Sequence, residues 1–167
     1  MNIIKLVSLS LLLSIWLVGC GEDDQEKTME KQIEHATGGE ADVDMSRESI
    51  SITSKTDEGE VKMQVGGNVA LPDAFPEDVF VYPGAKIESA IQMPEGFSVN
   101  MLSSDKKDRI TESYQKQMAK KGWTMQTSMD MGSQLMLIFE KNERAANVAI
   151  VDEGSDGVRI SLTISNN

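Results

Sequence analysis

Apolar and polar residues alternate through most of the chain after Arg47, and this two-residue period is the feature that most limits the fold. A strand places successive side chains on opposite faces of a sheet, so the alternation predicts strands with one face toward a core. We expect about eight short strands, lying within residues 50–65, 86–103, 123–127, 135–139, 148–150 and 158–164. The turns between them are short, which favours antiparallel pairing.

One segment has a helical period instead. Ile110, Tyr114 and Met118 recur every four residues, which places them on one face of a helix that ends at Gly122. A capping residue is expected at its start, from among Ser103, Ser104 and Asp105. The sequence therefore predicts an α+β fold in the order ββ-ββ-α-ββββ, with an antiparallel sheet and one amphipathic helix packed on one of its faces.

A connector rich in proline separates the two predicted hairpins from each other. Residues 71–85 read LPDAFPEDVFVYPGA, and their three prolines prevent regular strand pairing. The same stretch contains Phe75, Val79, Val81 and Tyr82, which are too apolar to be left in water. We expect an ordered loop held against the domain.

The start of the chain has the order typical of a secretory signal peptide. Lys5 precedes an apolar run over residues 6–18, and the small Gly19 precedes Cys20, the only cysteine of the chain. The run is shorter than the roughly 20 residues that a membrane-spanning helix needs. We therefore expect residues 1–19 to be a signal peptide.

The last residues of this leader, Leu17-Val18-Gly19-Cys20, resemble the bacterial lipobox. The resemblance implies cleavage before Cys20, lipidation of Cys20 and attachment to a membrane through the lipid. Several acyl chains hold a protein stably at a membrane. Gly21 follows the cysteine in place of aspartate, which by the same resemblance favours the outer membrane; the inner membrane is the alternative.

The next segment, residues 20–46, is polar and acidic, and its composition predicts a flexible tether. The spacing of Met29 and Ile33 also allows a short helix over residues 27–36, which would be marginal in isolation. Residues 47–167 are then long enough for a single domain. The whole chain has 16 basic and 27 acidic residues and a formal net charge of −11, and loss of Lys5 with the leader makes the exported part more acidic still. An acidic protein of this kind repels nucleic acid, so we expect no nucleic-acid partner.

The connector and the end of the helix resemble a group of uncharacterised bacterial lipoproteins. The residues that carry the resemblance are FPEDVFVYPGA in the connector and YQKQMAKKGW at the end of the helix, within residues 71–123. The resemblance implies one α+β domain of the cell envelope, with no assigned activity. The prolines and glycines of these motifs also suit a purely structural role.

The sequence predicts neither an enzyme nor a cofactor. The only histidine, His35, lies in the predicted tether, so a serine nucleophile has no base beside it. Pairs of acidic residues fall at predicted turns, where solvated side chains are the usual explanation. No glycine-rich phosphate loop of known spacing is present.

Two methionines at a predicted hairpin tip are candidate metal ligands. Met129 and Met131 lie in TMQTSMDMGSQLM, and thioethers are soft ligands that suit Cu(I). The competing interpretation is packing, because methionine often fills gaps in a core, and Met125 and Met136 fit strand positions that face one.

The predicted helix carries a basic stripe that is a candidate surface for a partner. Its members fall within about a quarter of the helical wheel: Lys106, Arg109, Lys116 and Lys120. The competing interpretation is a solvated helix face, in which the late lysines also suit the helix dipole. We therefore expect a membrane-anchored envelope lipoprotein with a non-enzymatic binding role, its partners being the membrane and an envelope protein. The alternative is a periplasmic copper or small-ligand binding protein that uses residues 125–136.

Overall fold

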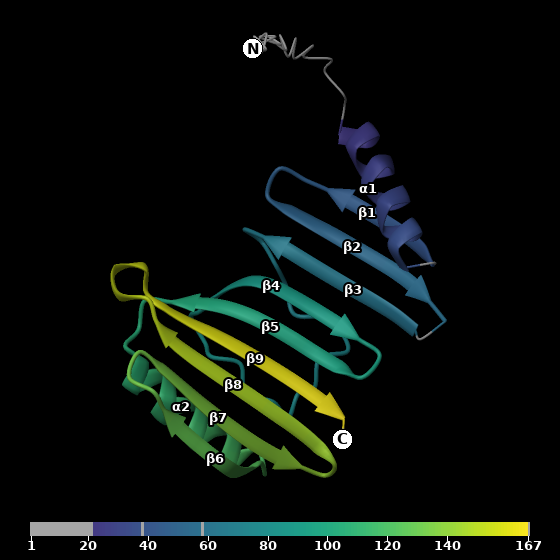
Figure 1. Ribbon diagram of the computed structural model, residues 1–167. Helices are drawn as coiled ribbons and strands as arrows, with labels where there is room; N and C mark the ends of the chain where they lie inside the picture. Colours follow the sequence, from purple (N-terminus) through teal and green to yellow (C-terminus); the bar gives the residue numbers. More distant parts are fainter. Residues whose placement is uncertain (1–21, 38, 58, 167) are drawn as a thin grey trace, which may run out of the picture.

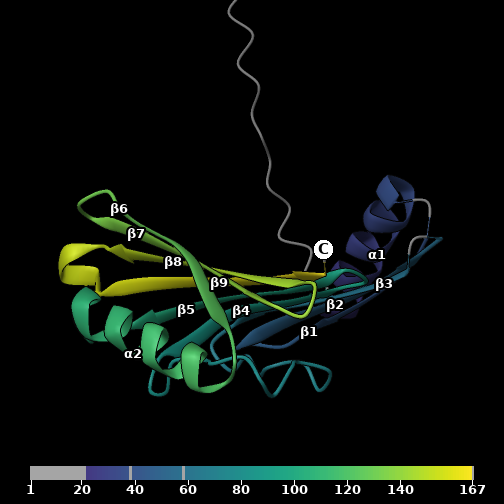
Figure 2. The ribbon, with the colours of Figure 1, turned by 90° about the horizontal axis from the view of Figure 1, so that it is seen from below.

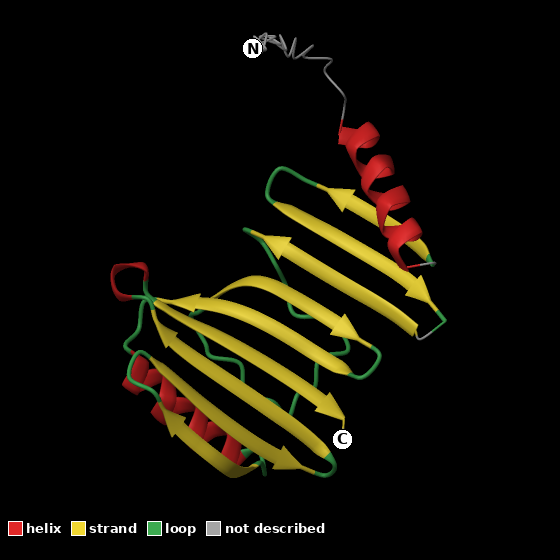
Figure 3. Ribbon diagram, viewed as in Figure 1, coloured by secondary structure: helices red, strands yellow, loops and turns green. Residues whose placement is uncertain are grey.

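The computed structural model describes residues 22–37, 39–57 and 59–166 (Figures 1 and 3). The predicted signal peptide and Cys20 lie outside the described residues. The elements follow in this order: α1 (Glu22–Thr37), β1 (Glu40–Met45), β2 (Ser49–Thr56), β3 (Gly59–Gly66), β4 (Lys86–Met93), β5 (Gly96–Ser103), α2 (Lys107–Lys120), β6 (Thr124–Asp130), β7 (Gln134–Lys141), β8 (Arg144–Asp152), the short 3-10 helix η1 (Gly154–Asp156) and β9 (Val158–Asn166).

The nine described strands form one sheet in the order β1-β2-β3-β4-β5-β9-β8-β7-β6. All neighbouring pairs except β5–β9 and β3–β4 are joined by short connections of two to five residues, and every pair is antiparallel. Helix α2 carries the chain from β5 past three strands to the far edge, where β6 begins the return. The predicted antiparallel α+β fold is confirmed, and its eight strands correspond to β2 through β9.

The count of eight strands and one helix is too low. Where the sequence predicted a flexible tether, residues 22–37 form α1 and residues 40–45 form β1, which pairs with β2. Figures 1 and 2 show that α1 and α2 lie on opposite faces of the sheet. We call the face that carries α2 the inner face and the other the outer face.

Helix α2 closes the main core as predicted. Ile110, Tyr114 and Met118 are fully buried against the inner face of β5, β7, β8 and β9. The predicted side-chain cap is wrong, because the N-cap residue is Lys106 and makes no side-chain cap bond. The hydroxyl of Ser103 instead accepts a hydrogen bond from the backbone N–H of Asp105 at 3.1 Å.

The apolar side of the sheet changes from one face to the other along its width. On the outer face, one row of paired residues begins at β1 with apolar side chains and becomes polar at β5: Val43, Ile52, Met63, Ile91, Ser98 and Thr163. The adjacent row on the inner face does the reverse: Asp42, Thr53, Lys62, Gln92, Phe97 and Ile164. Directly paired residues share a face. The sheet therefore has an apolar outer face near α1 and an apolar inner face near α2.

Helix α1 covers the free edge of β1 with carboxylates. Three glutamates one turn apart accept hydrogen bonds from alternate backbone N–H groups of the strand: Glu26 from Met45 at 2.7 Å, Glu30 from Val43 at 3.2 Å and Glu34 from Ala41 at 3.4 Å. The spacing matches, since four helical residues advance about 6.0 Å and two strand residues about 6.7 Å.

The connector between β3 and β4 is ordered, as predicted. Its carboxylate Asp78 lies 2.7 Å from the Lys141 ammonium, and Arg144 donates to both of its oxygens, at 2.5 and 3.1 Å. Arg144 also lies over the Trp123 ring, 5.1 Å from its centroid, and the Trp123 indole N–H donates to the backbone oxygen of Asp78 at 2.7 Å. The arginine and lysine lower the pKa of Asp78 to about 2.

Candidate functional site

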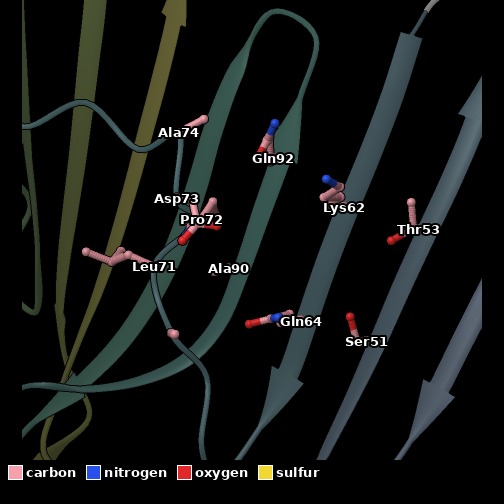
Figure 4. Close-up of a pocket in the computed structure, with 11 residues that line it drawn as sticks. Ser51, Thr53, Lys62, Gln64, Leu71, Pro72, Asp73, Ala74, Ala90 and Gln92 are labelled. Atoms are coloured by element: carbon pink, nitrogen blue, oxygen red, sulfur yellow. The ribbon is translucent and has the colours of Figure 1, made fainter.

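The connector and the polar part of the inner face enclose a cavity of about 330 Å³ (Figure 4). Its floor comes from three adjacent strands, β2, β3 and β4. Its wall is the connector segment 70–74, which crosses below the sheet (Figure 2). The floor consists of Ser51, Thr53, Lys62, Gln64, Ala90 and Gln92. We call this cavity the inner groove.

The floor of the inner groove is polar because the apolar side chains of the sheet lie on the outer face at this position. Ile50 and Ile52 of β2 alternate with Ser51 and Thr53, so the apolar pair faces outward and the hydroxyl pair faces the groove. The same alternation in β3 directs the amine of Lys62 inward together with an amide, that of Gln64.

Most of these polar groups have no side-chain hydrogen bond within the described residues. The exception on the floor is Lys62, whose ammonium lies 2.8 Å from a carboxylate oxygen of Glu60. This contact raises the pKa of Lys62, so the amine stays protonated, and Asp73 in the wall adds to the effect. The groove thus offers one cation and several neutral donors and acceptors.

The wall differs from the floor in chemistry. Leu71 packs against the main core, and Figure 4 shows its side chain directed away from Lys62 and Gln64. Pro72 and Ala74 add apolar surface, and Asp73 supplies one exposed carboxylate. A ligand in the groove would meet polar groups on one side and mainly apolar atoms on the other.

A second cavity, of about 540 Å³, continues the groove toward α1 and shares Thr53 with it. Its lining is mainly charged: Glu34, Glu40, Asp42, Lys55 and Glu60. Lys55 and Glu60 lie 3.9 Å apart. The polar region therefore reaches from the connector to the end of α1.

The basic stripe predicted from the sequence lies elsewhere. The N-cap residue Lys106 is exposed, as are Arg109, Lys116 and Lys120 of α2, and none of the four lines the inner groove. Arg109 pairs with Asp105 at 2.8 Å, while its own side chain stays 72% exposed. The stripe is thus exposed to solvent, and its role as a surface for a partner stays a prediction.

The predicted methionines lie at the opposite end of the sheet from the groove. Met129 and Met131 are half-exposed at the tip of the β6–β7 hairpin. Met125 is 45% exposed, so the expectation that it fills a core position is wrong. A register shift between Met125 and Thr127 displaces this part of the strand.

Sequence reasoning missed the inner groove. The signal was present in the alternation of Ser51 and Thr53 with apolar neighbours, but any solvated face of a strand has the same pattern. Only the position of residues 70–74 below the sheet turns that face into a groove.

Comparison with known proteins gives one similarity, to a part of the chain. A family model described as START domain-like matches residues 86–157, which run from β4 through η1 and include α2. The match leaves out α1, β1 to β3, the connector and β9. The chain matches no curated protein. It also matches no solved structure. Within the described residues, no helix is long and apolar enough to cross a membrane.

Proposed function

We propose that this protein is a lipid-anchored, non-enzymatic binding module of the bacterial cell envelope, and that it holds a small polar ligand in the inner groove. The observation that carries the proposal is the groove floor, where Ser51, Thr53, Gln64 and Gln92 have no side-chain hydrogen bond in the described part of the chain. Ligand sites are concave and place a few polar groups so that they converge on the ligand.

The similarity to a START domain-like family supports a binding role, because that fold is a binding fold. In this chain the space between α2 and the sheet is filled by core side chains, Tyr114 and Phe139 among them. The open space on the same face is the inner groove, which α2 does not cover. Strand β4 contributes Ala90 and Gln92 to its floor. The groove therefore borders the matched region.

Binding fits the chemistry of the groove better than catalysis does. A lysine acts as a base or nucleophile when its pKa is lowered, and the contact with Glu60 raises the pKa of Lys62 instead. The neighbouring hydroxyls of Ser51 and Thr53 have no histidine among the lining residues. Lys62 is suited to hold an anionic or carbonyl oxygen.

The lipid anchor rests on the resemblance of residues 17–20 to the lipobox, and the outer membrane is the favoured location. The test is metabolic labelling of cells with radioactive palmitate. Label should appear in the wild-type protein and be absent after Cys20→Ser. Label that persists in the variant would remove the anchor from the proposal.

The groove is tested by NMR on the isotope-labelled chain, titrated with neutral amino acids, dipeptides and disaccharides. A bound ligand should shift amide signals of β2, β3 and β4, including the side-chain amides of Gln64 and Gln92. Gln64→Leu and Thr53→Val remove polar groups without changing charge and should abolish the shifts. The matched control is Lys116→Ala on α2, which should leave them unchanged.

The same titration separates the groove from the basic stripe. Shifts confined to α2 that disappear when Lys106, Arg109 and Lys116 are replaced by glutamate would place the binding surface on the helix. Absence of any shift in the groove across all three ligand classes would contradict a site for small polar ligands.

A further inference from the structure

The tip of the β6–β7 hairpin exposes methionine side chains that pack into no core. Met125, Met129 and Met131 are 45%, 49% and 52% exposed, and together they form most of the exposed large apolar side chains among the described residues. Exposure of this size excludes the usual explanation of methionine as a gap-filler in a core.

The strand register gathers three of the hairpin methionines on one face. Met129 is paired directly with Met136 of β7. The backbone N–H of Met131 donates to the oxygen of Gln134 at 2.8 Å, which extends the ladder by one rung around the turn at Gly132. Met131 therefore follows Met129 on the same side, two residues along the strand.

That side is the outer face. The intervening Asp130 pairs with Leu135, which belongs to the main core, so Asp130 belongs to the inner side. It accepts a hydrogen bond from Lys107 of α2 at 3.3 Å, which agrees with this assignment. Met129, Met131 and Met136 consequently face away from α2.

The spacing brings the three thioethers within reach of one another. Directly paired residues have Cβ atoms about 5 Å apart, and alternate residues of a strand lie about 6.7 Å apart. Each methionine sulfur lies two bonds beyond its Cβ atom on a flexible stem. On the far side of Met136 the paired residue is the small Ala149, which leaves room beside the sulfur.

We propose that Met129, Met131 and Met136 form a binding site for Cu(I). Thioethers are soft, neutral ligands, and soft ligands select Cu(I) over harder divalent ions. The carboxylate between Met129 and Met131 in the chain, Asp130, already accepts hydrogen bonds from Lys107 and from the backbone N–H of Gly132. The site lies on the other face of the sheet and at the other end from the inner groove, so it does not depend on the function proposed for the groove.

The fourth methionine of the hairpin provides a matched control. Met125 is paired with Phe139, a buried residue of the main core, so it belongs to the inner side of the strand. It shares residue type and hairpin with the three proposed ligands, and it is about as exposed as Met129 and Met131. It differs from all three in the face on which it lies. Replacing it should leave metal binding unchanged.

The experiment is a titration of the full chain with Cu(I), without oxygen, in competition with a chromogenic Cu(I) chelator. Every sample carries Cys20→Ser, so that no thiol competes for the metal. We expect one Cu(I) per chain, loss of binding in the triple variant Met129→Leu, Met131→Leu and Met136→Leu, and wild-type binding in Met125→Leu. Leucine keeps the apolar surface and the volume, so the triple variant should unfold at the same temperature as the parent chain.

Two further readings decide between this site and others. In an NMR spectrum of the protein with isotope-labelled methionine methyl groups, the methyl signals of Met129, Met131 and Met136 should shift on addition of Cu(I). The methyl signal of Met125 should not shift. Affinity should not change between pH 5 and 7, since thioethers carry no proton to release. Failure to hold Cu(I) against the chelator, retention of the metal by the triple variant, or an equal loss in Met125→Leu would overturn the proposal.

Discussion

The two ends of the sheet are stabilised in different ways. At the α2 end, the helix buries apolar side chains such as Tyr114 and Met118 against the inner face. At the α1 end, the helix is held beside β1 by hydrogen bonds from the strand's N–H groups to the carboxylates of Glu26, Glu30 and Glu34. The difference shows that one continuous sheet can change the side of its core, and the inner groove lies where that change occurs.

The two edge strands show the same contrast. The outward N–H groups of β1 are occupied by α1, which removes a template for pairing with another chain. Strand β6 has no such cover among the described elements, and nearly all of its side chains are exposed. Its bulge after Met125 bends the edge, which is a known means of discouraging edge-to-edge association.

The largest difference is expected from deleting apolar side chains at the two ends. Leu137 is fully buried at the α2 end, and Leu137→Ala should lower the free energy of unfolding by about 2–5 kcal/mol. Ile52, on the outer face near α1, is only partly buried, so Ile52→Ala should cost about half of that or less. Urea unfolding followed by circular dichroism measures both. Equal losses of unfolding free energy in the two variants would contradict a difference in apolar burial between the two ends.

The carboxylate of Asp78 makes the α2 end sensitive to acid. Its pKa is lowered to about 2 in the folded chain, below the usual value near 3.8. The stabilisation is therefore complete above about pH 4 and is lost as the pH falls through 2. After allowance for a side chain that is 33% exposed, it amounts to about 1–2 kcal/mol.

The measurement is the free energy of unfolding as a function of pH. Asp78→Asn should be less stable than the parent chain at pH 6, and the two should converge toward pH 2. Parallel curves for the two proteins would show that Asp78 does not provide the acid sensitivity.

A smaller and more local effect is expected at the α1 end. Glu30→Ala removes the acceptor for the N–H of Val43, which should weaken the edge by about 1 kcal/mol and speed hydrogen exchange of that amide roughly fivefold. Glu30→Gln keeps an acceptor oxygen and should change exchange less. Amides of β7 serve as the internal reference. Unchanged exchange at Val43 in the alanine variant would mean that the carboxylates do not secure the edge.

The smallest effects are expected at two buried hydroxyls, one at each end. The hydroxyl of Tyr114 in the main core and that of Ser54 near α1 have no hydrogen-bond partner among the described residues. Tyr114→Phe and Ser54→Ala should therefore leave stability unchanged or raise it by up to about 1 kcal/mol.

Tyr82→Phe serves as the contrasting variant, because the Tyr82 hydroxyl donates to Asp105 at 2.7 Å. The free energy of unfolding of Tyr82→Phe should be about 1 kcal/mol lower than that of the parent chain. Thermal unfolding separates the three variants, and a clear loss in Tyr114→Phe would reveal a partner for that hydroxyl.

Alternation of apolar residues was enough to predict β2 through β9, and the four-residue period was enough to predict α2. The alternation was not enough to predict β1. Ala41, Val43 and Met45 also alternate there, but acidic neighbours gave the segment the composition of a tether. What orders this segment is a set of contacts with glutamates of α1, 7 to 19 residues earlier in the chain. Local composition contains no information on contacts of this kind.

The candidate sites illustrate the same limit. Met129 and Met131 could be selected from the sequence by residue type, but the inclusion of Met136 and the exclusion of Met125 depend on register and on one bulge. The floor of the inner groove could not be selected at all, since its side chains resemble those of any solvated strand until the connector is placed beside them.

The arrangement of α1 against β1 also determines how the fold responds to force. A pull on the chain before Glu22 enters the folded structure through α1, and it reaches the hydrogen bond between Glu26 and Met45 before the one between Glu34 and Ala41. Under a pull directed away from the sheet, the bonds are thus stretched one after another from one end, as in peeling, and not all at once, as in shearing. Helix α1 can yield by itself under tension while the α2 end of the sheet keeps its shape.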